Sequence, residues 1–306
     1  EGEYINGERN GKGKEYNYYG QLMFEGKYLN GDRNGKGKEY YEHSKLMFEG
    51  KYLNGKRWDG KGYNKDGIIE FEIKNGNGKG KEYYENGELK FEGEYFNGVK
   101  NGKGIKYYKD CNLKAERNEN SNKHDDGGKL KFEGEYKNGE KNGKGKEYYS
   151  IKSIFNTYSK YYLIFEGEYL NGKKNGKGKE YYLCSSALNF EGDYFNGKRN
   201  GKGKEYYKYG KLKFEGEYLN GKINGKGKEY NKNGELMFEG EYLNGKRWDG
   251  KGKEYYEDGK IMFEGEYLKG ERNGKGKEYY KFGILKFEGE YLKGEKKWKR
   301  KRILWI

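Results

Sequence analysis

Hydrophobic and polar residues alternate in short runs along this chain and never gather into long apolar segments. In the segment Leu-Lys-Phe-Glu-Gly-Glu-Tyr-Leu (212–219), the Phe, Gly and Tyr share one face of an extended strand, and the glutamates share the other. Alternation with a period of two is typical of a β-strand whose faces meet different environments. No helical period appears, and the frequent glycines would destabilise helices. The pattern predicts an all-β protein.

Asn-Gly dipeptides separate the predicted strands. Asn220-Gly221 follows the strand at 212–219, and a second strand is expected in the segment Gly-Lys-Gly-Lys-Glu-Tyr (225–230). Asn and Gly tolerate the positive φ angles that two-residue hairpin turns require. Each unit is therefore predicted to be a β-hairpin.

The same unit recurs along the chain at a common step of 23 to 25 residues. The first unit begins at Glu1 and lacks the opening Phe of the others. A variant unit at Phe71 carries Ile73 in place of glycine and has a shortened turn. The regular units begin at Phe24, Phe48, Phe91, Phe132, Phe165, Phe190, Phe214, Phe238, Phe263 and Phe287. A period of this length is typical of arrays in which each unit packs on its neighbours. We expect residues 1–306 to form one array of about twelve units, an open single-layer antiparallel β-meander in an elongated, solenoid-like ribbon.

Two segments interrupt the repeat without changing its phase. Residues 111–128 are polar and predict a surface loop insertion. Residues 150–163 are richer in aromatic and aliphatic side chains and fit either an extended hairpin or an adhesive loop. Because the chain begins inside a repeat and without Met, we expect it to be a fragment.

Charge and ring placement predict a strand register. In the unit at 165–182, setting Tyr169 opposite Gly178 also sets Glu168 opposite Lys179, and such opposite charges contribute roughly 0.2–1 kcal/mol per pair. The equivalent register would set Tyr218 opposite Gly227. Aromatic rings are then expected to lie over glycines, where no Cβ obstructs them. The candidate groove residues are Phe165, Gly167, Tyr169, Gly176, Gly178, Phe214, Gly216, Tyr218, Gly225, Gly227, Phe263, Gly265 and Tyr267.

These units resemble the MORN (membrane occupation and recognition nexus) repeat family, whose pattern is aromatic-x-Gly-x-aromatic, a turn, then Gly-x-Gly. Phe165, Gly167, Tyr169, Gly176 and Gly178 occupy those places, and nearly every unit repeats them. The Tyr-Tyr-Glu-Asn-Gly segment at 83–87 also resembles the variant repeat of bacterial antitoxin-like proteins. The resemblance implies a scaffold, a dimerisation module or a membrane-associated adaptor. Three features depart from the family pattern: Phe for the usual first Tyr, Tyr for the usual Trp, and a high Lys content.

Composition supports a non-enzymatic, repeat-built chain. Only 31% of the residues are hydrophobic, yet 18% are aromatic and 36 are Tyr, so aromatic residues must supply the buried surface. Two cysteines in unrelated segments favour a reducing compartment, and cytoplasmic localisation is expected. No apolar run is long enough to span a membrane.

Recognised catalytic chemistry is missing from the sequence. The segment at 50–56 matches most of a phosphate-binding loop, but Arg57 follows where a Ser or Thr is required. Only His43 and His124 are present, far apart in sequence, and the carboxylates recur at equivalent places with apparent Lys partners. We expect no catalytic residue, no cofactor and no metal site.

Basic residues offer a second possible surface. The net charge is +15, and Gly-Lys-Gly-Lys segments predict a lysine stripe that either attracts anionic lipid or nucleic acid or pairs with glutamates, the reading we favour. That stripe comprises Lys36, Lys38, Lys103, Lys144, Lys146, Lys177, Lys179, Lys226 and Lys228.

The C-terminal segment 296–306 is both basic and aromatic, and three interpretations stay open: docking on an anionic membrane, a decayed thirteenth turn, or nuclear import. Its candidate anion-binding residues are Lys296, Lys297, Trp298, Lys299, Arg300, Lys301, Arg302 and Trp305.

The function expected from the sequence is a scaffold for protein–protein interaction and assembly through a repeated aromatic/glycine groove. The alternatives are a peripheral membrane adaptor that binds anionic phospholipids through the lysines and the tail, and an antitoxin-like binding module. Open sheet edges invite pairing with another chain, so a homo-oligomer is expected. Nucleic acid is disfavoured as a partner because the repeat already accounts for the tyrosines.

Overall fold

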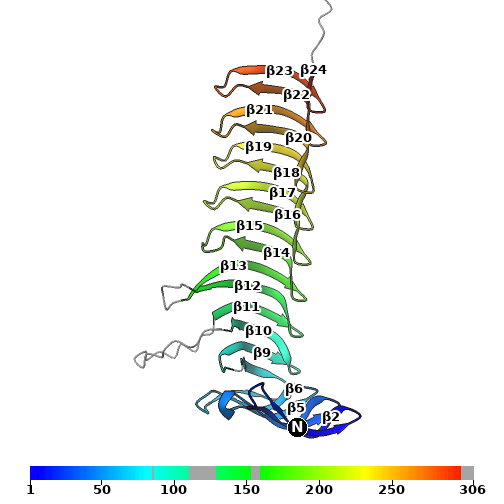
Figure 1. Cartoon of the computed structure of the whole chain (residues 1–306), viewed down its shortest axis with the longest axis vertical. Helices are drawn as coiled ribbons and strands as arrows, with labels where there is room; N and C mark the ends of the chain where they lie inside the picture. Colours follow the sequence, from blue (N-terminus) through cyan, green and yellow to red (C-terminus); the bar gives the residue numbers. More distant parts are fainter. Residues whose placement is uncertain (85, 110–128, 153–158, 298–306) are drawn as a thin grey trace, which may run out of the picture. The chain divides into compact units, whose positions relative to one another are not determined.

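The computed structural model describes residues 1–84, 86–109, 129–152 and 159–297 of the chain (Figure 1). The chain forms two compact units, 1–173 and 174–306. Apart from a single 3-10 turn at Glu42–Ser44, the regular structure of the described residues is β-strand. This confirms the all-β prediction.

The first unit holds a seven-stranded antiparallel sheet, β1–β7, followed by a second meander that starts at β8. In place of a ladder, β7 and β8 share one isolated bridge between Lys74 and Asn77. This break falls in the variant unit that begins at Phe71, where the hairpin arms are too short to pair fully. The strands are β1 (Gly2–Ile5), β2 (Glu8–Tyr16), β3 (Leu22–Leu29), β4 (Asp32–Tyr40), β5 (Leu46–Leu53), β6 (Lys56–Tyr63), β7 (Ile69–Ile73), β8 (Gly78–Tyr83), β9 (Leu89–Phe96), β10 (Val99–Tyr108), β11 (Lys129–Lys137), β12 (Glu140–Lys152) and β13 (Ser159–Leu170).

The second unit is an antiparallel meander in which successive hairpins lie one beyond the other (Figure 1). Its strands are β14 (Lys173–Tyr181), β15 (Leu188–Phe195), β16 (Lys198–Tyr206), β17 (Leu212–Leu219), β18 (Lys222–Tyr230), β19 (Leu236–Leu243), β20 (Lys246–Tyr255), β21 (Ile261–Leu268), β22 (Glu271–Tyr279), β23 (Leu285–Leu292) and β24 (Glu295–Lys297). Within each unit, the ladders of the described residues join only strands that are neighbours in the chain. The open, single-layer meander predicted from the sequence is therefore confirmed.

The Asn-Gly turns adopt the expected geometry and also link one hairpin to the next. Asn220 has φ 51° and Gly221 has φ 87°, the pair of positive angles that defines a type I′ turn. The Gly221 N–H donates to the Arg199 carbonyl of the preceding hairpin at 2.8 Å. The Asn220 N–H donates to the side-chain oxygen of Asn200 at 3.2 Å. Each turn thus rests on the turn before it.

The predicted register is wrong. Tyr218 pairs with Ile223, and Gly227 pairs with Gly216 instead of Tyr218. A bulge between the Gly216 pair and the Tyr218 pair shifts the ladder, and Gly225 there has φ 101°. Facing glycines allow a close backbone approach, because a Cβ built on Gly216 would lie 2.6 Å from the Gly227 Cα.

The predicted pairing of Tyr169 with Gly178 in the unit at 165–182 stays a prediction. On their other sides Tyr169 lies opposite Gly143 of the preceding strand, and Gly178 lies opposite Gly192 of the following one. Tyrosines do face glycines, but the first glycine of the Gly-x-Gly pair on the strand before, as Tyr218 faces Gly201. Opposite charges still meet across the ladder, for example Glu215 and Lys228.

The two insertions are only partly described. Strands β12 and β13 continue their ladder through Ser150–Tyr161 to Lys152–Ser159, so the described part of 150–163 is an extended hairpin. Residues 111–128 lie outside the described residues. The division of the chain into one array with two insertions stays a prediction.

Candidate binding groove

One face of the sheet buries the phenylalanines of the repeat under their neighbours. Phe190 has no exposed surface and Phe214 is 2% exposed. Phe190 packs edge-to-face on Tyr194 of its own strand, with ring centroids 5.7 Å apart, and on Tyr218 of the next hairpin, at 5.2 Å. Phe214 continues the series with Tyr218 at 5.6 Å. Such pairs add about 0.5–1.5 kcal/mol each beyond the burial of area.

The missing glycine side chains leave the space that these rings occupy. A Cβ built on Gly203 would lie 2.5 Å from Phe190 Cζ and 3.2 Å from Tyr218 Cε2. A Cβ on Gly227 would lie 2.4 Å from Phe214 Cζ. The expected aromatic-over-glycine packing is therefore present, although the phenylalanines and not only the tyrosines fill the gaps.

A cation covers most of the repeat phenylalanines and joins neighbouring hairpins, whereas Ile223 takes the equivalent place beside Phe214. The Arg199 guanidinium lies 4.0 Å from the Phe190 ring centroid and bonds Glu180 and Glu205, both at 2.5 Å. Lys100 covers Phe91 in the same way at 4.2 Å. Cation–π contacts of this kind add about 0.5–2 kcal/mol when partly desolvated. This cation–glutamate ladder was not predicted from the sequence, although an Arg or Lys near the start of most second strands was a visible signal.

In the first unit two arginines, Arg33 and Arg57, share the carboxylate of Glu39. Arg57 bonds this carboxylate at 2.6 Å, and the Tyr52 hydroxyl donates to it at 2.7 Å. Burial opposes ionisation of Glu39, but Arg57 and Arg33 outweigh it and lower its pKa to about 2. Burial and the same carboxylate raise the pKa of Tyr52.

The second tyrosine of each Tyr-Tyr pair fastens one hairpin to the next. The Tyr207 hydroxyl donates to the Tyr230 carbonyl at 2.9 Å, and Tyr182 donates to the Tyr206 carbonyl at 2.6 Å. The first tyrosine of the pair turns to the other face, where Tyr206 donates to Glu191 at 2.6 Å. Both roles depend on the hydroxyl, which explains why Tyr predominates at these places.

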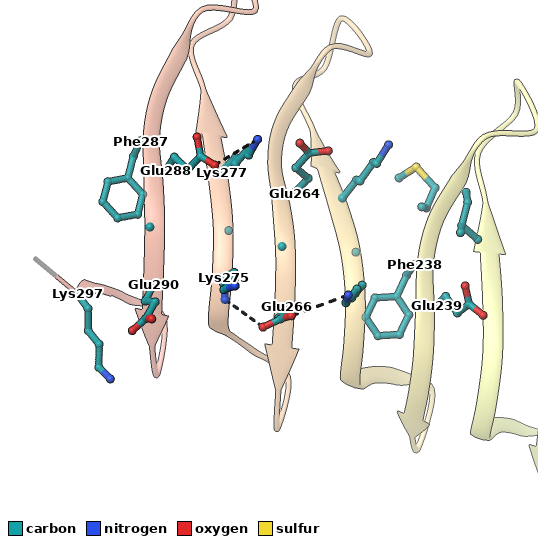
Figure 2. A pocket seen from close by; sticks show the side chains of 18 residues that line it. Phe238, Glu239, Glu264, Glu266, Lys275, Lys277, Phe287, Glu288, Glu290 and Lys297 are labelled. Carbon is teal, nitrogen blue, oxygen red and sulfur yellow. Dashed lines mark hydrogen bonds and ion pairs between the residues drawn. The ribbon is translucent and has the colours of Figure 1, made fainter. Parts of the chain in front are cut away.

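The opposite face carries a groove between two rows of charged side chains. In the second unit one row contains Glu264, Lys277 and Glu288, and the other contains Glu266 and Lys275, with paired glycines between the rows (Figure 2). The groove encloses about 1120 Å³. A similar groove of about 880 Å³ lies on the sheet of the first unit.

Glutamates and lysines alternate along these rows and contact one another. Lys277 lies 3.3 Å from Glu288 across the strands (Figure 2). The Glu266 carboxylate accepts the backbone N–H of Lys275 at 3.0 Å, the residue after the bulge glycine. The glutamate at this position therefore satisfies a donor that the bulge sets free.

The aromatic members of the predicted groove belong to the buried face and not to the open groove. Phe165 is 1% exposed, and Tyr169 and Tyr218 are 4% exposed, so these rings are not available to a partner. Gly265, by contrast, lines the open groove. The members of the set are Phe165, Tyr169, Phe214, Tyr218, Phe263 and Tyr267 on the ring face, with Gly167, Gly176, Gly178, Gly216, Gly225, Gly227 and Gly265 in the facing strands.

Most lysines of the predicted stripe lie opposite carboxylates. Lys144 faces Glu168, and Lys177 faces Asp193 in an ion pair. Lys228 lies 3.1 Å from Glu239. These contacts agree with the reading in which the stripe pairs with glutamates.

The start of the basic C-terminal segment also belongs to the sheet. Lys296 lies 2.7 Å from Glu278 and 4.9 Å from the Phe287 ring centroid, so it completes the cation ladder. Lys297 pairs with Glu290 in the strand ladder. The other candidates, Trp298, Lys299, Arg300, Lys301, Arg302 and Trp305, lie outside the described residues.

The described ranges hold neither a metal cluster nor a membrane-spanning helix. Among those residues there is no cluster of three or more His, Cys, Asp or Glu side chains that could hold a metal ion. Within the same ranges no helix is long and apolar enough to cross a membrane. His43 lies in the short 3-10 turn, with φ 64°.

Two models of known repeat families match segments of this chain. The MORN repeat model matches residues 1–17, 91–110, 132–153, 165–182, 190–210, 214–235 and 263–281. The MORN repeat variant model matches residues 33–54, 76–97 and 248–269. The chain belongs to the MORN-repeat family. MORN repeats are typically non-enzymatic modules that bind proteins or associate with membranes, and the resemblance drawn from the sequence is confirmed.

Comparisons with whole proteins add little to the MORN assignment. No curated protein matches this chain. Solved structures that match include crystal structures of TcdB2-TccC3-TEV and TcdB2-TccC3-Cdc42, at 13% and 12% identity and a TM-score of 0.18 for each. They align with 94% and 95% of this MORN chain, which spans only 16% of the length of each of those chains. At that TM-score the likeness implies nothing about fold or function.

Proposed function

We propose that this MORN-repeat chain is a non-enzymatic scaffold that binds partner proteins along the charged groove of its sheet. The observation that carries the proposal is the groove itself, about 1120 Å³ in the second unit, with its two rows of Glu and Lys and its glycine floor. The charged groove, and not the aromatic surface expected from the sequence, is the candidate contact surface, because the aromatic rings are buried.

Repetition gives such a groove its binding strength. Exposed ion pairs are individually weak, about 0–1 kcal/mol each, and salt screens them. A partner that contacts several hairpins at once adds these small contributions through effective concentration. Binding should therefore depend on the length of groove that a partner covers and should weaken as ionic strength rises.

Charge reversal inside the groove tests the proposal. The double variant Lys275→Glu and Lys277→Glu changes an exposed and a half-buried lysine of the groove on β22, on either side of Gly276. The matched control, Lys232→Glu and Lys281→Glu, makes the same change of charge at two exposed turn positions. Affinity capture from the source cell should recover the same partner proteins with the wild type and the control, and lose them with the groove variant. Loss with both variants, or with neither, would contradict groove binding.

A second arm of the experiment separates the membrane alternative. Flotation with vesicles that contain or lack anionic lipid measures membrane binding by the same three chains. Protein capture without flotation supports the scaffold. Flotation that survives in the groove variant, with no captured protein, would move the function to a peripheral membrane adaptor.

A further inference from the structure

The groove of the first unit differs in charge from that of the second. One of its rows places four lysines on four successive strands: Lys12 on β2, Lys27 on β3, Lys36 on β4 and Lys51 on β5. Lys12 pairs directly with Lys27, and Lys36 pairs with Lys51, so like charges face each other across the ladder. All four side chains are exposed.

The second unit contains a matched segment that lacks this row. Residues 191–252 repeat the pattern of residues 1–62 at a constant offset, and both segments end in an Arg-Trp-Asp-Gly hairpin. The matched row there alternates in charge, and its members are Lys202, Glu217, Lys226 and Glu241. Lys27 and Lys51 thus stand where the matched segment has Glu217 and Glu241, and these two differences make the row entirely basic.

The fold does not require lysine at these two places. In the second unit the Glu217 carboxylate accepts the backbone N–H of Lys226 at 3.1 Å. A lysine ammonium cannot accept a hydrogen bond, so Lys27 gives up that contact. Within the described ranges none of the four lysines forms an ion pair. Asp59 faces Lys51 at the end of the row, but its carboxylate accepts the Asn75 N–H at 2.7 Å.

The second row of the same groove restricts what could neutralise the lysines. It alternates in charge, with Lys14 opposite Glu25, and Lys38 between Glu25 and Glu49. A broad anionic surface laid over the groove would meet these carboxylates as well as the lysines. A narrow ligand that follows one row avoids them. The space of about 880 Å³ between the rows is enough for an extended peptide segment.

We infer that the four-lysine row of the first sheet binds an extended acidic segment of a partner protein, lying across β2 to β5. Strands lie about 4.8 Å apart, so the row spans roughly 14 Å. Alternate side chains of an extended peptide are about 6.6 Å apart, so three carboxylates at alternate positions match the row. This inference rests on the proposed function, because it names a partner class for the same groove.

The test uses a labelled peptide, Ser-Glu-Ser-Glu-Ser-Glu-Ser, and the full chain. Fluorescence anisotropy should show binding that weakens with salt, and no binding of the matched peptide with Gln in place of Glu. The double variant Lys27→Glu and Lys51→Glu restores the residue found in the matched segment, so it should fold normally and lose at least tenfold in affinity. The reciprocal variant, Glu217→Lys and Glu241→Lys, should create a second site and raise the stoichiometry from one peptide to two.

Three outcomes would overturn the inference. They are failure of the wild-type chain to bind the Glu peptide, equal affinity in the Lys27→Glu and Lys51→Glu variant, and equal affinity for the Gln peptide. Preferential binding of a single-stranded oligonucleotide or of anionic vesicles, lost in the same variant, would also assign the row to another ligand. These failures leave the proposed function intact if the capture of partners still depends on Lys275 and Lys277.

Discussion

Residues 1–62 and 191–252 show which parts of a hairpin hold the sheet and which are free to change. In both segments the phenylalanines are buried under their neighbours, with Phe24 fully buried and Phe214 2% exposed. Both segments pair glycine with glycine, Gly26 with Gly37 and Gly216 with Gly227, and both carry a bulge beside that pair. The charged face differs at positions 27 and 51, and the backbone pairing does not.

The two segments also differ on the buried face. Arg33 bridges Glu15 and Glu39 in the first segment, whereas Ile223 occupies the matched place in the second. The type I′ turn that follows rests on the Arg33 carbonyl in one segment and on the Ile223 carbonyl in the other. Glycines, rings and turns therefore fix the backbone, while cations strengthen a fold that is already specified.

The largest expected effect is loss of a buried ring. Phe24→Ala and Phe214→Ala should each destabilise the surrounding hairpins by about 3–5 kcal/mol, because each leaves a cavity on the buried face, under Arg33 in the first segment and beside Ile223 in the second. Phe282→Ala, at a side chain that is 83% exposed, should change stability by less than about 0.5 kcal/mol. Chemical denaturation measures all three. An equal loss at Phe282 would contradict the assignment of the buried face.

Acid sensitivity should differ between the segments. The pKa of Glu39 is lowered to about 2, so its stabilising contribution is complete above its ordinary pKa of 4.5 and is lost as the pH falls toward 2. Glu39→Gln should therefore cost on the order of 3 kcal/mol at pH 7 and flatten this part of the pH profile.

The matched change Glu229→Gln should cost less free energy of unfolding. Arg247 pairs with Glu229 at 2.9 Å, but Ile223 stands where the first segment has its second arginine, Arg33. Urea unfolding at pH 7 and at pH 3 gives both comparisons. Equal costs for the two substitutions would show that the second arginine contributes nothing.

A smaller loss is expected from filling the space above a glycine. Gly227→Val should force the Phe214 ring aside and cost about 1–3 kcal/mol, as overpacking commonly does. Because each hairpin contacts its neighbours, amide hydrogen exchange should rise in β17–β19 and stay unchanged in distant strands. Lys226→Val, on the exposed face beside it, is the control. A uniform rise along the chain would contradict the linear array.

The smallest effect concerns the tyrosine link between hairpins. Tyr207→Phe removes the hydrogen bond to the Tyr230 carbonyl and should cost about 0.5–1.5 kcal/mol. The control is Tyr209→Phe in the same turn, at a side chain that is 94% exposed, and it should change stability by less than about 0.5 kcal/mol. Thermal unfolding compares the two. An equal loss at Tyr209 would show that the link is not the source of the effect.

Much of this fold could be predicted from sequence because period-two alternation and Asn-Gly turns act locally. The pairing of Tyr218 with Gly227 failed because a bulge is needed where glycines face each other, and a bulge leaves little trace in charge or hydropathy. The groove was placed on the ring face because the sequence alone does not show that Arg199 and its equivalents cover the phenylalanines. The basic row could not be predicted either, because the sequence does not show that Lys27 lies opposite Lys12 on the neighbouring strand.

The central claim is that the charged face decides what binds, while the two matched segments share one fold. Carbodiimide coupling tests this directly, since it forms an amide bond between a peptide carboxylate and a lysine Nζ held against it. After coupling of the Glu peptide to the wild-type chain, mass spectrometry should find adducts at Lys12, Lys27, Lys36 and Lys51. Lys202 and Lys226 should carry few, because Glu217 and Glu241 stand beside them. Equal labelling of the two segments would contradict the account.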